Sequence, residues 1–219
     1  MIRDLIEREV DSSVEFDEDS YNDALEIYNG WELGFSLTDV MSSKEVIEGI
    51  AKNTLCFPHF KNNGKFTFPH MAKKDYSLSD WKEAIEIRSA DVISYKFKKT
   101  SQDEVPSRID VFGKKNYYKD EYEIAQVDWE LTKLDDALLK FNGYQYSNDN
   151  ILELETDYIR KNGTFMAFAS EQKNFRKIQK NIVELRVPLK YIDIEVGDIV
   201  KFDQLIDGIK AYGNDYTKV

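Results

Sequence analysis

Several residue types on which common classes of protein depend are scarce in this chain of 219 residues. A single cysteine, Cys56, excludes an internal disulfide and a cysteine-rich metal site. No run of about 18 apolar residues exists to span a bilayer, and the first residues lack the apolar stretch of a signal peptide. These absences predict a soluble protein that is made in the cytoplasm and stabilised by packing.

The chain also has fewer basic than acidic residues. It contains 30 Lys and Arg and 41 Asp and Glu, which gives a net charge of −11. A protein that grips phosphates needs Lys and Arg clustered on one face. The sequence therefore predicts no direct, sequence-specific binding of nucleic acid and no binding to a membrane. Hydrophobic residues make up 42% of the chain and aromatic residues 13%, which is enough to build a folded core.

Motifs of catalysis and cofactor binding are absent from the sequence. It contains no phosphate-binding glycine loop, no dinucleotide fingerprint, no nucleophile elbow and no helical zinc-binding pair of histidines. Only His59 and His70 could serve a catalytic triad or a metal. A two-residue turn at Asn63-Gly64 would pair His59 with Phe68 and put both histidines on one face of a hairpin. No carboxylate lies inside the hairpin to complete a four-ligand site, so we expect no metal there.

Three other sets of residues carry reactive or charged groups. Alternation puts Cys56 on the opposite strand face from His59, so we expect a buried, inert thiol. The acidic clusters 15–19 and 149–155 lack the spacing of a calcium loop and are expected to be solvated surfaces. The basic run 96–99 is expected to be an ordinary strand with a solvated face rather than a nucleic-acid patch. The sequence thus predicts no catalytic residue, no cofactor, no metal site and no enzyme.

The N-terminal part of the chain alternates helical and strand patterns. Ser20 is typical of a helix cap and predicts a helix over 20–30, after which residues 32–37 alternate as a strand does. Ser42 and Glu45 have the spacing of a capping box, which predicts the start of a second helix. The Asn63-Gly64 pair then predicts a short hairpin, because both residues tolerate a positive φ.

Further along, residues 77–85 predict one more short helix, which carries Trp81. Two strands are predicted over 92–97 and 108–112, around a polar loop. Residues 163–179 have the period of a long helix with phenylalanines on one face. After it, residues 183–202 alternate and turn as a strand pair does.

These elements predict an α+β fold with short helices packed on small, mostly antiparallel sheets. We place the boundary between two subdomains near residue 88. Residues 1–88 would form an α/β subdomain with the order helix, strand, helix, hairpin. Residues 89–219 would form a β-rich subdomain with one long helix over about 163–179. Residues 117–150 show neither period clearly, so no element is predicted there.

The most specific pattern of the chain lies in residues 181–203. There a strand, Val187-Pro188-Leu189-Lys190-Tyr191, precedes a turn, Glu195-Val196-Gly197-Asp198. This segment resembles phage tail tip and baseplate hub proteins, especially tail proteins of marine phages, in which the first of these positions is a leucine. Residues 91–100 and the strand from Ser107 resemble paired strands of the same proteins, and residues 35–68 resemble their helix, strand and Asn-Gly turn.

This resemblance implies a structural component of the virion, in the phage tail, that is made in the host cytoplasm. It implies a homo-oligomer, a trimer or hexamer around the tail axis, with surfaces for tube, spike or fibre proteins. It brings no catalytic residues. Members of the family are longer, which predicts that this chain is a fragment or the product of a split gene.

Two other functions remain open at this point. One is a hub-like binding module of a non-viral secretion or injection assembly. The other is a tail-associated cell-wall hydrolase, which would need a cleft with convergent carboxylates or a histidine with a perturbed pKa.

Overall fold

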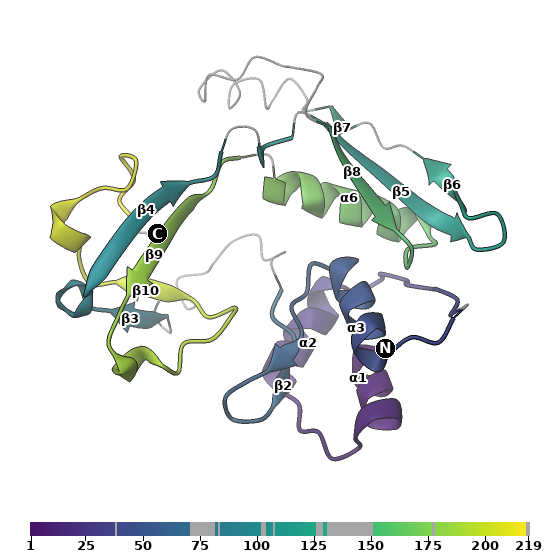
Figure 1. Cartoon of the computed structure of the whole chain (residues 1–219), viewed down its shortest axis with the longest axis horizontal. Coiled ribbons are helices and arrows are strands. Elements are labelled where there is room, and N and C mark those ends of the chain that lie inside the picture. Colours follow the sequence, from purple (N-terminus) through teal and green to yellow (C-terminus); the bar gives the residue numbers. More distant parts are fainter. Residues whose placement is uncertain are drawn as a thin grey trace. The chain divides into compact units, whose positions relative to one another are not determined.

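The computed structural model describes residues 1–37, 39–70, 82, 84–101, 104–106, 108–125, 129–130, 151–176 and 178–217. The fold is α+β, as predicted. The chain divides into two compact units, each built from two segments (Figure 1). Unit 1 comprises residues 1–72 and 105–178, and unit 2 comprises residues 73–104 and 179–219. This division differs from the predicted boundary near residue 88, because strands far apart in the sequence pair with each other.

The first helices of unit 1 are short and amphipathic. α1 (Ile2–Leu5) continues into a π-helical turn (Ile6–Val10), which buries Ile6. α2 (Glu18–Ile27) begins after Asp17, whose carboxylate accepts the backbone N–H of Ser20 at 3.3 Å. The predicted cap at Ser20 is therefore wrong, because Asp17 in extended conformation already places an acceptor over the first free N–H groups.

α3 (Ser43–Lys52) confirms the predicted capping box. The Glu45 N–H donates to the Ser42 hydroxyl at 3.2 Å, and the Ser42 N–H donates to the Glu45 carboxylate at 2.7 Å. The predicted strand over 32–37 is reduced to one antiparallel bridge, between Leu33 and Ile159. Only this part of the segment meets partner backbone, as in the 2.8 Å bond from the Gly34 N–H to the Tyr158 carbonyl.

The predicted hairpin is present, but its register differs from the expected one. β1 (His59–Phe60) pairs with β2 (Phe66–Thr67), and His59 lies opposite Thr67 rather than Phe68. The Lys61 N–H donates to the Lys65 carbonyl at 2.8 Å, which leaves a loop of residues 62–64. Gly64, at φ +82°, supplies the left-handed residue with which such three-residue loops end.

The sheet of unit 1 is centred on β5 (Arg108–Asn116). β6 (Glu121–Ala125) and β7 (Trp129–Glu130) pair with it antiparallel, and β8 (Ile151–Thr156) pairs with it parallel. β6 and β7 lie in the stretch for which no element was predicted, and most of that stretch is outside the described residues.

α6 (Asn162–Arg176) confirms the predicted long helix and runs along one face of the sheet (Figure 1). It contributes Phe165, Phe168 and Ala169 to a buried cluster with Ile109, Val111 and Ile159. A second cluster joins the N-terminal helices to the hairpin and includes Ile2, Ile6, Phe16, Val46, Ile50, Cys56, Phe66, Phe68 and Tyr158.

Unit 2 contains two small pairs of strands. β3 (Ile85–Ile87) pairs parallel with β10 (Val200–Phe202), and β4 (Ser94–Lys99) pairs antiparallel with β9 (Asn181–Arg186). The predicted pairing of the strands over 183–202 with each other is therefore wrong, and so is that of β4 with β5. Ile85 lies in a strand rather than in the predicted helix, the rest of which falls mostly outside the described residues.

One face of the β4–β9 pair packs inside unit 2. The Phe97 ring lies 5.5 Å from the ring of Tyr216, which in turn lies 5.2 Å from that of Phe202. Ile87, Ile206 and Ala211 are buried in the same unit. The alternating residues of β4 and β9 thus have an apolar face toward the unit and a charged face toward solvent.

Candidate functional site

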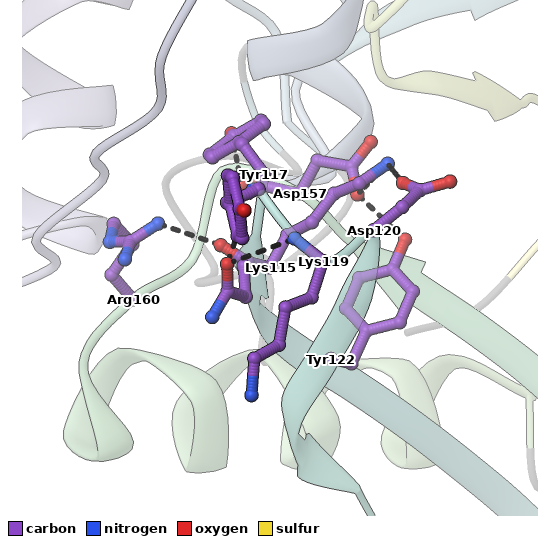
Figure 2. Close-up of polar contacts among 9 residues, drawn as sticks. Lys115, Tyr117, Lys119, Asp120, Tyr122, Asp157 and Arg160 are labelled. Carbon is purple, nitrogen blue, oxygen red and sulfur yellow. Dashed lines mark hydrogen bonds and ion pairs between the residues drawn. The ribbon is translucent and has the colours of Figure 1, made fainter.

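A cluster of polar side chains lies where β5 turns into β6 (Figure 2). The Lys115 ammonium lies 3.1 Å from Asp120 Oδ1 and 3.8 Å from Asp157 Oδ1. The Tyr122 hydroxyl donates to the same Asp157 oxygen at 2.6 Å. Asp157 follows β8, so these contacts join the β5–β6 hairpin to the turn after the neighbouring strand.

Backbone groups take part in the same cluster. The Tyr117 hydroxyl donates to the Asp157 carbonyl at 3.0 Å, and the Arg160 guanidinium donates to the Lys115 carbonyl at 3.0 Å (Figure 2). Asp120 closes the turn with φ +55°, a conformation that Asp adopts more readily than most residues. The cluster therefore fixes the shape of the hairpin.

The Tyr122 phenol and the Lys115 amine of this cluster are unsuited to act as a base or a nucleophile. Burial raises the pKa of Tyr122, and its hydrogen bond to Asp157 raises that pKa further. The hydrogen bond to Asp120 raises the pKa of Lys115. At neutral pH the phenol thus keeps its proton and the amine keeps its charge, whereas a base or nucleophile needs the deprotonated form.

An apolar cavity of about 440 Å³ lies among the N-terminal helices of unit 1. This volume falls within the range of small-molecule sites, roughly 300–1,000 Å³. Its charged side chains are already engaged, since Arg3 contacts Glu7 at 2.9 Å and Glu18 at 3.0 Å, and Glu32 pairs with Lys161. The cavity offers mostly apolar surface, and the Cys56 thiol, which also lies at its wall, stays protonated at neutral pH because burial raises its pKa to about 12. Its walls include Ile2, Tyr21, Ala24, Leu25, Tyr28, Trp31, Leu33, Ile50 and Phe68.

The two histidines do not share one face of the hairpin, so that prediction is wrong. His59 lies opposite Thr67, while His70 forms a bridge with Cys56. Thr67 and His70 are three residues apart, and an odd spacing puts side chains on opposite faces of a strand. His59 Nδ1 donates to the Phe57 carbonyl at 2.8 Å. Among the described residues, no group of three or more His, Cys, Asp or Glu is placed to hold a metal ion.

Cys56 is buried, as predicted, with 6% of its surface exposed. Burial raises the pKa of its thiol to about 12. Since the thiolate is the reactive form, this cysteine is poorly suited to nucleophilic attack at neutral pH.

We expect Cys56 to react with an aromatic disulfide reagent at pH 8 at least ~100-fold more slowly in the folded protein than in denaturant. A thiol with a pKa of about 12 is thiolate in roughly one molecule in 10,000 at that pH, against about one in four for an ordinary cysteine. Stopped-flow absorbance measures both rates. Val40→Cys provides a fully exposed thiol in the same chain as a reference. Equal rates at positions 40 and 56 would contradict the buried thiol.

Where the structure describes them, the charged clusters take part in ordinary surface contacts, as predicted, while Asp149 and Asn150 of the second acidic cluster lie outside the described residues. In the cluster 15–19, Asp17 accepts a 2.9 Å contact from Lys61 while capping α2. In β8 the side chains of Glu153 and Glu155 are exposed, between half-buried leucines. In the basic run, Lys98 pairs with Glu184 across the β4–β9 ladder.

The segment after β9 exposes three large aliphatic side chains. Leu189 is 82% exposed, Ile192 67% and Val196 68%. We call these three residues the apolar ridge. They follow one another at spacings of three and four, within and after a 3₁₀ turn (Leu189–Tyr191), so the chain that carries them is compact rather than extended.

Polar contacts anchor the backbone that carries the ridge. The Tyr191 hydroxyl donates to Asp91 Oδ2 at 2.8 Å and accepts the Arg88 N–H at 3.1 Å. Lys190 pairs with Asp91 and, with Tyr191, holds the pKa of that carboxyl below its usual value. The Glu195–Asp198 turn, predicted from the sequence, is closed by a 2.8 Å bond from the Glu195 N–H to the Asp198 carboxylate.

The sequence did not reveal the ridge. Leu189 continues the alternation of β9 and was therefore expected to lie in a strand, but Pro188 precedes it and the chain turns there. The available signal was the polar pair Lys190-Tyr191 between Leu189 and Ile192, because both of these polar side chains contact Asp91.

No protein-family model matches this chain, and no curated protein matches it significantly. No helix among the described residues combines the length and the apolar character that crossing a membrane requires.

Proposed function

We propose that this chain is a structural component of a bacteriophage tail, in the tail tip or baseplate hub, and that it works by binding other tail proteins. One observation carries the proposal. Residues 181–203, which most resemble tail hub proteins, are the part of the chain that holds the apolar ridge. Large apolar side chains exposed together on anchored backbone are typical of a protein-binding surface.

The surroundings of the ridge support a protein partner. Asp193 and Asp198 are exposed close to the aliphatic residues in the sequence, which gives the apolar centre a polar rim. The contacts of Asp91 with Lys190 and Tyr191 hold the turn before any partner arrives. Binding then costs less conformational entropy than it would for an unanchored loop.

The described polar clusters support assembly rather than catalysis. The hairpin cluster around Lys115 and Asp157 is engaged in holding two turns together, and the Cys56 thiol at the wall of the apolar cavity has a pKa that burial raises to about 12. The partners we propose are tube, spike or fibre proteins of the same tail.

A variant with Leu189→Asp, Ile192→Asp and Val196→Asp should fail to assemble into the tail. We expect its amount in purified tail particles to fall at least ~10-fold, because three carboxylates would have to be desolvated in the contact. Quantitative mass spectrometry of particles released from cells that carry the gene measures this. The thermal unfolding midpoint should change little, since the three side chains already face water.

The matched control carries the same three charges on other exposed apolar residues. Val10→Asp, Leu37→Asp and Val40→Asp replace side chains that are 53%, 56% and 105% exposed. This variant should enter particles as the wild type does. Wild-type amounts of the ridge variant in the particles would overturn the proposed role of the ridge.

A further inference from the structure

The backbone of β9 has an outer edge that forms no hydrogen bond with a described residue. The register with β4 pairs Lys96 with Glu184, and the Thr100 N–H donates to the Lys180 carbonyl at 3.0 Å. In an antiparallel ladder, this bond assigns the even-numbered residues of β9 to hydrogen bonding with β4. The N–H and C=O groups of Val183 and Leu185 therefore point the other way.

The outer edge of β4 differs from that of β9. There the Tyr212 hydroxyl approaches the outward carbonyl of Phe97 at 3.4 Å. Along β9, no described residue donates to or accepts from the outward groups of Val183 and Leu185. Such an edge is a template for another strand, and a ribbon of two strands has little stability alone.

The sequence of β9 is complementary to itself in one antiparallel register. If Leu185 lies opposite Leu185 of a second copy, Glu184 lies opposite Arg186 and Val183 opposite Val187. The outward groups of Val183 and Leu185 then form the hydrogen bonds, as the ladder requires. The two Glu184–Arg186 contacts are equivalent, since a two-fold axis passes through the Leu185 pair.

Charge selects this register over its neighbour. In the neighbouring register, one strand is shifted by two residues toward its N-terminus, and Glu184 lies opposite Glu184 of the second copy. Like charges directly opposite each other destabilise a sheet. Arg186 is exposed and has no ion pair among the described residues, so it is available to a second copy. Glu184 already contacts Lys98 on one side and would accept Arg186 on the other.

The faces of the strands agree with the same arrangement. Val183 and Leu185 are half-buried on the apolar face, whereas Glu184 and Arg186 are exposed on the opposite face. A two-fold axis perpendicular to the sheet keeps each face on its own side. The apolar face would therefore become continuous, and the new ion pairs would stand in solvent.

We propose that two copies of this chain pair through the outer edge of β9 and form a four-stranded sheet in the order β4, β9, β9, β4. The pairing rests on contacts within unit 2 and does not depend on the proposed tail function. It identifies a two-fold contact, distinct from a ring closed around a tail axis.

Engineered cysteines test the register directly. In the proposed pair the two Leu185 Cα atoms would lie about 5.5 Å apart, which is within the range of a disulfide. The two Val183 Cα atoms would lie about 14 Å apart, because four residues at about 3.4 Å separate them along the strands. Mild oxidation of Leu185→Cys should give a covalent dimer on a non-reducing gel, and Val183→Cys should give none. Linkage of both variants, of neither, or of Val183→Cys alone would overturn the proposal.

A charge reversal tests the association without a new bond. Arg186→Glu puts two carboxylates opposite each other twice in the dimer and should weaken association at least ~10-fold. Lys99→Glu makes the same change of net charge on the other strand, where it should leave association unchanged. Light scattering behind a sizing column, over a range of concentrations, measures the mass, and circular dichroism confirms that both variants fold. A wild type that stays monomeric, or an assembly of any size that Arg186→Glu leaves unchanged, would overturn the proposal.

Discussion

Replacement of Phe168 by alanine should lower the free energy of unfolding of unit 1 by about 3–5 kcal/mol. Phe168 is 3% exposed and packs from α6 into the cluster that holds Val111 and Ile159, both of which are fully buried. The alanine would lose the transfer free energy of the ring and leave a cavity that the sheet cannot close. Since domains are stable by only about 5–15 kcal/mol, this one change would remove a large share of the total.

Met166→Ala on the same helix is the matched control, because Met166 is 45% exposed. Its effect should stay within about 1 kcal/mol. Urea unfolding followed by circular dichroism gives both values. A Phe168→Ala protein as stable as Met166→Ala would mean that α6 does not pack on the sheet as described.

The second large effect is expected at Gly113 in β5. A Cβ atom there would lie 2.7 Å from the Phe165 ring and 2.9 Å from the Thr156 hydroxyl. Neither neighbour can move freely, since both are buried and the Thr156 hydroxyl donates to the Phe112 carbonyl at 2.7 Å. Gly113→Ala should therefore destabilise unit 1 by about 1–3 kcal/mol through overpacking.

Two further variants separate this steric effect from a general intolerance of glycine replacement. Gly163, near the start of α6, has no atom within 4 Å of an added Cβ, so Gly163→Ala should be neutral or stabilising by up to about 1 kcal/mol. In a Phe165→Leu background the cost of Gly113→Ala should shrink, because the ring that blocks the methyl group is gone. Costs that simply add would show that Phe165 is not the obstacle.

Local signals in the sequence predicted several helices correctly. Ser42 and Glu45 are three residues apart and satisfy each other's hydrogen bonds whatever the rest of the chain does, which is why α3 starts as expected. Phe165 and Phe168 recur at helical spacing, so the helix and part of its buried face were evident. Ile178, expected on the same face, lies past the end of the helix and is 39% exposed. Asp17 escaped notice because several acidic and hydroxyl residues in a row can each serve as a cap.

Strand pairing could not be read from the sequence to the same extent. β4 and β9 lie in different parts of the chain, and their alternation states which face is apolar but not which strand is the partner. The same holds for β3 and β10, which pair in parallel across more than a hundred residues. The two units are interleaved for this reason, and a single boundary near residue 88 could not describe them.

The prediction that the two histidines share a face failed because the turn is one residue longer than expected. Asn63-Gly64 was expected to form a two-residue turn, but the loop includes residue 62 as well, and the register shifts by one. A shift of one residue exchanges the faces of a strand, so His59 and His70 separate. The sequence predicts no catalytic or metal-binding residue, so the candidate site had to be a binding surface. Which side chains form such a surface depends on the tertiary structure.

Immunogold electron microscopy of particles released by cells that carry the gene tests the proposed tail function most directly. Antibodies against this chain should place gold at the tip of the tail, at the end distant from the capsid, and the label should be lost in particles made with the ridge variant. Tailed particles that carry no gold, while the chain is abundant in the same cells, would contradict the account.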